Sequence, residues 1–311
     1  MKSLFQLLLL FLYTTINVQT IPQGYLLGAT FEIARISNKL YKINPLTGES
    51  TVFVVLEDYT PFDIAYDLNK KIIYIFADKI SAVEDDSTQS LVLVNPINGT
   101  TRFRTIFQEE ITELCGLRVD SNTSQLYSLQ MTGAEPNSAS IVQINPPDFV
   151  AKTWVDISNV DGITPDSKAF FYNSTHHQYF VTLALGLNDV LVGVDVKNRK
   201  VISRISNAHL PSFLCYDNHT NAFYGMQRFT GKRGCHLVRF NPYNGSSVVL
   251  SEDFNGYEPS AGNCYEGYYF TMLILNSNTQ NIVTFDLNNS GKVIANKQGA
   301  EYFDSLAFIP I

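Results

Sequence analysis

The sequence has 311 residues, of which 45% are hydrophobic and 16% are charged, and its formal net charge is −7. This length suits one large all-β domain, and the many Phe (21) and Tyr (17) residues favour β-strands. The acidic balance argues against a nucleic-acid partner, because no basic stripe is present to neutralise phosphates.

Residues 1–20 are predicted to be a signal peptide. Lys2 supplies a positive charge, residues 4–13 form an apolar stretch too short for a comfortable membrane span, and a polar segment follows. Cleavage is expected between residues 17 and 21. Because no later stretch is apolar over the length of a span, we expect residues 21–311 to form a single secreted domain without a membrane span.

A short motif recurs along the whole mature chain. Its first copy, residues 42–48, reads Lys-Ile-Asn-Pro-Leu-Thr-Gly: a strand-like run leads into Asn or Asp, often Pro, and a turn near Gly. The Asn or Asp positions of the six copies are 45 to 51 residues apart: Asn44, Asn95, Asn145, Asp195, Asn241 and Asp286. A period of this size, built from short strands, is typical of propeller blades.

Each repeat is expected to contribute four strands, A to D. In the second repeat these are residues 62–67, 72–76, 91–94 and 101–107. In four repeats the last residue of strand A is followed seven residues later by an aromatic residue, which predicts one A–B turn geometry; these residues are Asp67, Asp120, Asn173 and Asp217. The sixth repeat shortens this turn to Glu266-Gly267. Full blades are expected near 59–107, 108–158, 159–206, 207–252 and 253–299.

The two ends of the chain are expected to share one blade. Residues 24–56 contain strands B, C and D but no strand A, while residues 302–308 (Tyr-Phe-Asp-Ser-Leu-Ala-Phe) are similar to strand A of the second blade. Inserting the last strand into the first blade removes a free sheet edge and covers its apolar faces. The sequence therefore predicts an all-β, six-bladed β-propeller whose first blade is closed by the C-terminal strand.

The repeated Leu/Val-x-x-Asn/Asp-Pro-x-x-Gly turn resembles the secreted six-bladed β-propeller superfamily, with quinoprotein-like or YVTN-like repeats. It lacks the Trp-Asp dipeptide of WD40 blades, the Gly-Gly pair of kelch blades and the Tyr-Trp-Thr-Asp signature of receptor propellers. The resemblance implies the fold and carries over no functional residue.

Six Asn-x-Ser/Thr sequons indicate a secreted glycoprotein: Asn98, Asn122, Asn173, Asn218, Asn244 and Asn288. All six fall in A–B or C–D turns, which share one face of the disc. Turns are rich in Asn and Gly, so chance is the alternative explanation. The opposite, sequon-free face carries loops of variable length and is the expected binding side.

The loops that enter strand A carry acidic and aromatic residues. If they ring the channel mouth, the candidate ligand-binding residues are Tyr59, Glu113, Asp161, His209, Glu258 and Glu301. Carboxylates suit calcium in the central channel, or a small polar or cationic ligand; solvated loop carboxylates are the alternative. No catalytic residues are assigned, because no hydrolase or nucleotide-binding motif is present.

The four cysteines lie at irregular spacing without a C-x-x-C pair, which argues against a metal knuckle. Cys215 and Cys264 each stand two residues before the end of strand A, so we expect equivalent positions whose side chains point the same way around the ring. A bridge between them would then be awkward. Buried free thiols are expected, and one disulfide is the alternative.

These features predict a binding propeller that recognises an extracellular protein or a small polar or cationic ligand through its sequon-free face. The alternative is a metal-dependent propeller hydrolase of the lactonase or esterase type.

Overall fold

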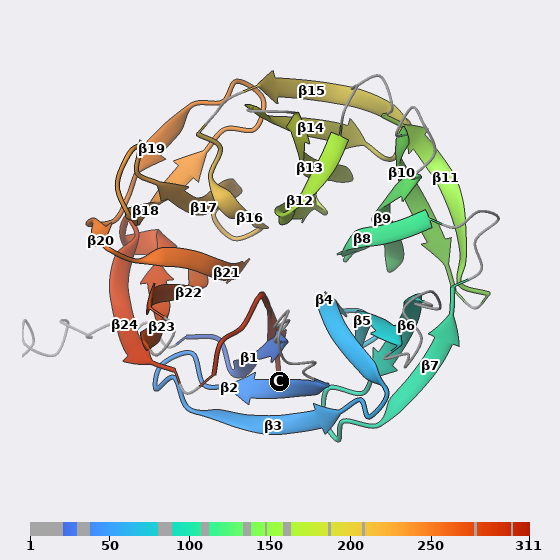
Figure 1. The fold of residues 1–311 in the computed structure, drawn as a ribbon, viewed down its shortest axis with the longest axis horizontal. Helices are drawn as coiled ribbons and strands as arrows, with labels where there is room; N and C mark the ends of the chain where they lie inside the picture. Colours follow the sequence, from blue (N-terminus) through green and yellow to red (C-terminus); the bar gives the residue numbers. More distant parts are fainter. Residues whose placement is uncertain are drawn as a thin grey trace, which may run out of the picture.

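The computed structural model describes residues 21–29, 38–79, 89–106, 112–132, 138–146, 148–157, 163–185, 188–206, 209–276, 279–299 and 301–311. Residues 1–20, the predicted signal peptide, lie outside these ranges. Six antiparallel sheets surround a common axis, with β4, β8, β12, β16 and β21 innermost (Figure 1). In the described ranges, no helix is long and apolar enough to cross a bilayer.

The first blade consists of β25 (Ser305–Pro310), β1 (Gly24–Ala29), β2 (Lys39–Ile43) and β3 (Ser50–Val55), and the second of β4 (Tyr59–Asp67), β5 (Ile72–Lys79), β6 (Gln89–Val94) and β7 (Thr101–Thr105). The third blade consists of β8 (Thr112–Asp120), β9 (Gln125–Thr132), β10 (Ser138–Asn145) and β11 (Val150–Asp156), and the fourth of β12 (Ile163–Asn173), β13 (Gln178–Leu185), β14 (Asn188–Asp195) and β15 (Lys200–Ser206). The fifth blade consists of β16 (Ser212–Asp217), β17 (Ala222–Arg228), β18 (Gly234–Phe240), β19 (Ser247–Val249) and β20 (Phe254–Asn255), and the sixth of β21 (Glu258–Tyr265), β22 (Tyr268–Asn276), β23 (Thr279–Asp286), the 3-10 helix η1 (Leu287–Asn289) and β24 (Lys292–Gln298).

The C-terminal strand closes the ring as predicted. β25 pairs antiparallel with β1 from Gly24 opposite Pro310 to Ala29 opposite Ser305. The sixth blade then packs against this composite blade, and the Thr284 hydroxyl donates a hydrogen bond of 2.7 Å to the Pro45 carbonyl. The six-bladed propeller with a shared first blade is therefore confirmed.

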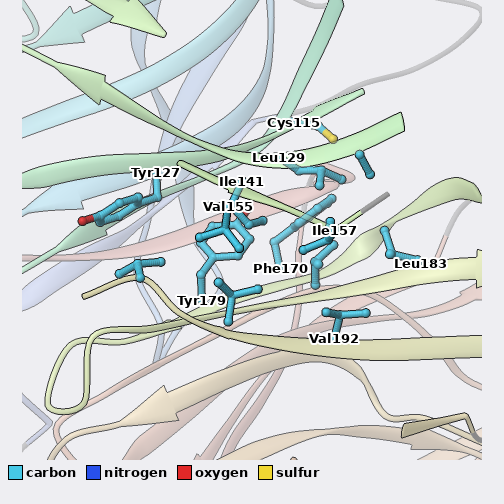
Figure 2. Close-up of a cluster of buried hydrophobic side chains, with 14 of the residues drawn as sticks. Cys115, Tyr127, Leu129, Ile141, Val155, Ile157, Phe170, Tyr179, Leu183 and Val192 are labelled. Carbon is cyan, nitrogen blue, oxygen red and sulfur yellow. The ribbon is translucent and has the colours of Figure 1, made fainter. Parts of the chain in front are cut away.

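The core lies between neighbouring blades. Figure 2 shows one such cluster, in which Leu129 and Ile141 of the third blade meet Tyr179 and Val192 of the fourth. All four side chains are buried. Each blade buries both of its faces in this way, so a blade depends on its two neighbours for stability.

The Asp residues that end strand A link neighbouring blades as well as forming their own turns. Asp217 accepts hydrogen bonds from the Thr220 amide (2.8 Å) in its own turn and from the Gly267 amide (2.9 Å) of the sixth blade. Similar links join the second blade to the third and the third to the fourth: Asp67 to Ser124 (3.0 Å) and Asp120 to His177 (2.7 Å).

We expect Asp217→Ala to lower the free energy of unfolding by about 3 kcal/mol, because it leaves two amide donors without their acceptor at a buried site. The matched control is Asp195→Ala, since Asp195 bonds to Asn198 within its own turn. That variant should lose less than about 1 kcal/mol. Urea denaturation measures both, and equal losses would show that the link between blades contributes nothing.

Candidate functional site

The centre of the ring contains a cavity of about 290 Å³ whose walls come from the inner strands of all six blades: β4, β8, β12, β16, β21 and β25. A–B turn residues also line it: Leu68, Ser121, Ser174 and Asn218. The cavity therefore occupies the A–B-turn end of the channel, which is the face that carries the sequons.

Aromatic rings form much of this wall. The second-to-last residues of β4, β12 and β16 are Tyr66, Tyr172 and Tyr216, and all three line the cavity. Tyr265 and Phe308 also line it, and their rings stack with 4.8 Å between the centroids. We call these five residues the aromatic belt. Burial, followed by the charge of Glu266, raises the pKa of Tyr265 to about 12, and burial raises the pKa of Tyr66 and of Tyr172. Their phenols therefore remain neutral at physiological pH.

An ion pair lies in the same cavity and joins three blades. Arg118 of the third blade contacts Asp63 of the second, with 3.1 Å between Nη1 and Oδ1. The same guanidinium donates to the carbonyl of Phe170 in the fourth blade through Nε (3.0 Å) and Nη2 (2.5 Å), and the Leu117 amide donates to Asp63 Oδ2 (2.5 Å). Sequence reasoning did not single out this pair, although each is a charged residue within an inner strand.

Burial raises the pKa of Asp63, while the Arg118 guanidinium and the Leu117 amide act in the opposite direction. The native state therefore binds this proton at higher pH than the unfolded chain, whose carboxyl titrates near 3.8. The protonated Asp63 carboxyl therefore contributes its full stabilisation below about pH 3.8. This contribution is lost as the pH rises through the raised pKa of the native state.

We therefore expect the free energy of unfolding of the wild type to fall relative to that of Asp63→Asn as the pH rises above about 4. Denaturation at a series of pH values measures this difference. If the wild type instead gains stability relative to Asp63→Asn as the pH rises, the Arg118 charge lowers the pKa of Asp63 more than burial raises it.

The predicted ligand-binding residues do not line the cavity where their side chains are described. The Tyr59 ring stacks on Phe103 at 4.6 Å, and Glu258 pairs with Arg233, with 3.0 Å between Oε1 and Nε. His209 and Glu301 lie exposed in loops. Glu113 lies in β8 opposite Met131, and Asp161 falls outside the described residues.

The described residues offer no group of three or more His, Cys, Asp or Glu side chains placed to hold a metal ion. Calcium in the channel therefore stays a prediction without a described set of ligands.

The expectation of free thiols at Cys215 and Cys264 is wrong. The two residues form a disulfide between β16 and β21, with 5.8 Å between their Cα atoms. Both also line the cavity. Cys115 and Cys235 lie outside this disulfide and are buried, and burial raises the pKa of the Cys235 thiol to about 12.

Turn length explains why the two cysteines meet. In the fifth blade the A–B turn closes on the pair Asp217 and Ala222, whereas in the sixth it closes on Tyr265 and Tyr268. Cys264 therefore lies one residue before the closing pair of its turn, as Tyr216 does in the fifth blade. Cys215 lies two residues before the closing pair of its turn. A shift of one residue turns a side chain to the other face of its sheet, so the two thiols face each other across the space between the blades.

Comparison with known proteins identifies the fold alone. No protein-family model matches the chain, and no curated protein matches its sequence. The structure is similar to TolB from Acinetobacter baumannii, with a TM-score of 0.64, 11% identity and coverage of 93% of this chain and 67% of that one. It is also similar to a chain in the crystal structure of a nidogen/laminin complex (TM-score 0.63, 14% identity, coverage 92% and 98%).

A third similar structure is the periplasmic gluconolactonase PpgL of Pseudomonas aeruginosa, with a TM-score of 0.58, 11% identity and coverage of 93% of this chain and 99% of that one. These proteins differ in function while sharing the architecture, as superfolds commonly do. The chain is therefore a six-bladed β-propeller, and its function has to be argued from its own cavity.

Proposed function

We propose that this protein is a secreted glycoprotein whose propeller acts as a binding module, with the cavity at the A–B-turn end of the channel as its ligand site. The observation that carries the proposal is the cavity itself: about 290 Å³, walled by six strands and lined by aromatic rings with a few polar groups. Small-molecule sites have this composition and a similar or larger size. The proposed site thus lies at the opposite end of the channel from the sequon-free face.

Three features support secretion. The Cys215–Cys264 disulfide suits an oxidising compartment. Five sequon asparagines are exposed: Asn98, Asn122, Asn218, Asn244 and Asn288. Residues 1–20 have the composition of a signal peptide, and we propose residues 21–311 as the mature propeller domain.

The sixth sequon differs from the others. Asn173 is 1% exposed, and its Nδ2 lies 3.1 Å from the His176 ring. At Asn98, by contrast, the Thr100 hydroxyl donates to Oδ1 at 2.9 Å and the side chain is exposed. A glycan on Asn173 would have to displace buried contacts.

In a eukaryotic secretion host we therefore expect Asn98→Gln to remove the mass of one N-glycan and Asn173→Gln to remove none. Intact-mass analysis before and after enzymatic deglycosylation measures this. A glycopeptide that contains modified Asn173 in folded, secreted protein would contradict the expectation.

Binding in the cavity is tested with the neutral fluorescent probe N-phenyl-1-naphthylamine. We expect its emission to rise with wild-type protein and to stay low with Ser305→Trp, which fills part of the cavity wall. The matched control is Ser247→Trp, which adds the same side chain to an exposed site on β19 and should bind the probe like the wild type. Equal binding by all three proteins, or by none, would overturn the proposed site.

The hydrolase alternative has its own test. A rise in melting temperature with calcium, and metal retained after dialysis, would favour a metal-dependent enzyme over a binding module. Charge reversals at Glu113, Asp161 and Glu258 would then locate the metal, and unchanged affinity in all three would place it elsewhere.

A further inference from the structure

We infer that the cavity selects an organic cation, that is, an ammonium group carried on a small apolar body. The inference deepens the proposed function and rests on the cavity being a ligand site. It follows from the aromatic belt and from the charges of the cavity wall.

The aromatic belt supplies the contacts that a desolvated ammonium group prefers. The five residues of the belt line the same end of the channel. Phe308 stacks on both Tyr265 (4.8 Å) and Phe270 (5.1 Å), and Tyr172 stacks on Tyr127 (5.7 Å), so the contact with a ligand is assigned to Tyr66 and Tyr216. An aromatic ring attracts a cation over its face, and the attraction grows as water is excluded. Burial keeps the phenols of Tyr66, Tyr172 and Tyr265 neutral, so these residues attract a cation through their rings and not through phenolate charge.

The wall offers little to an anion. Arg118 is the only base among its described residues, and its guanidinium is already occupied: it contacts Asp63 and donates to the carbonyls of Phe170 and Leu117. A carboxylate or phosphate would have to break these bonds to gain the two-pronged contact that arginine normally provides. The ligand class that remains is neutral or cationic.

The balance of charge favours the cation. Two acids line the cavity, Asp63 and Asp304, and Arg118 neutralises the first of them. Asp304 precedes β25 and accepts a hydrogen bond from the Tyr302 hydroxyl. When both carboxyls are ionised, the described wall carries one net negative charge, in a site with low-dielectric walls that strengthen its effect on a bound cation.

The experiment compares three probes of similar size by calorimetry and by displacement of N-phenyl-1-naphthylamine: phenyltrimethylammonium, benzyl alcohol and benzoate. We expect the cation to bind about tenfold more tightly than the alcohol, and benzoate to bind most weakly. Equal affinities for the cation and the alcohol would overturn the inference and leave the proposed site intact. Failure of the naphthylamine probe to enter the cavity would overturn both.

Leucine and phenylalanine variants at two positions separate ring contact from packing. Tyr216→Leu and Tyr66→Leu should weaken phenyltrimethylammonium about fivefold to tenfold and benzyl alcohol little, while Tyr216→Phe and Tyr66→Phe keep cation affinity because they keep the ring. Asp304→Asn should reduce the affinity for the cation and not for the alcohol. Leu variants that melt like the wild type and still bind the cation normally would contradict the inference.

Discussion

Removal of residues 301–311 is expected to abolish secretion of folded protein. The deletion takes away β25, which pairs with β1 over six residue pairs and buries the side chains of Leu306, Phe308 and Ile309. Each ladder hydrogen bond contributes about 1 kcal/mol, and each large buried side chain about 1.5–3 kcal/mol. The total, on the order of 10 kcal/mol, matches the whole stability of a typical domain.

The measurement is the amount of protein in the medium and its thermal unfolding. The control is deletion of Ile311 alone, whose side chain is 88% exposed and whose amide makes one hydrogen bond, to the Gln23 carbonyl. That shorter deletion should be secreted and melt within a few degrees of the wild type. A truncation at residue 300 that is secreted and melts normally would show that the first blade is stable with three strands.

The second large effect is expected at the disulfide. Replacing both Cys215 and Cys264 by alanine should lower the free energy of unfolding by about 4 kcal/mol, because the bridge closes a loop with a sequence separation of 49 and so restricts the unfolded chain. Dithiothreitol should destabilise the wild type by a similar amount and leave the double variant unchanged. Chemical denaturation with and without the reductant measures both.

Cys235→Ala is the control, since Cys235 is buried and free. It loses some packing but should remain sensitive to dithiothreitol. Thiol titration of the unfolded protein gives an independent readout: two reactive thiols before reduction and four after it. Four thiols before reduction would rule out the bridge.

Much of the architecture was predictable because its signals are local. Asn44 and its five equivalents mark turns, and alternating residues on either side of them mark strands, so the number of blades follows from counting repeats. Closure followed from the same counting, because one repeat lacked an inner strand and residues 302–308 supplied one. These features depend on neighbours in the chain or on the general need to cover sheet edges.

The candidate site was not predictable in the same way. Asp63 and Arg118 are 55 residues apart in the chain, and nothing in the sequence around either residue indicates that they pair once the blades pack together. The position of the cavity along the channel depends on how six inner strands converge. Glu258, which the sequence placed in a loop at the channel mouth, is the first residue of β21 and pairs with Arg233 on the surface.

The sequence by itself determined the repeat, the strand order and the shared first blade, because turn chemistry and residue spacing act over a few residues. Only the tertiary structure determined which side chains meet between blades. The Cys215–Cys264 bridge shows the reason: a two-residue turn in place of a four-residue turn shifts the strand register by one residue, and that reverses the face to which a side chain points.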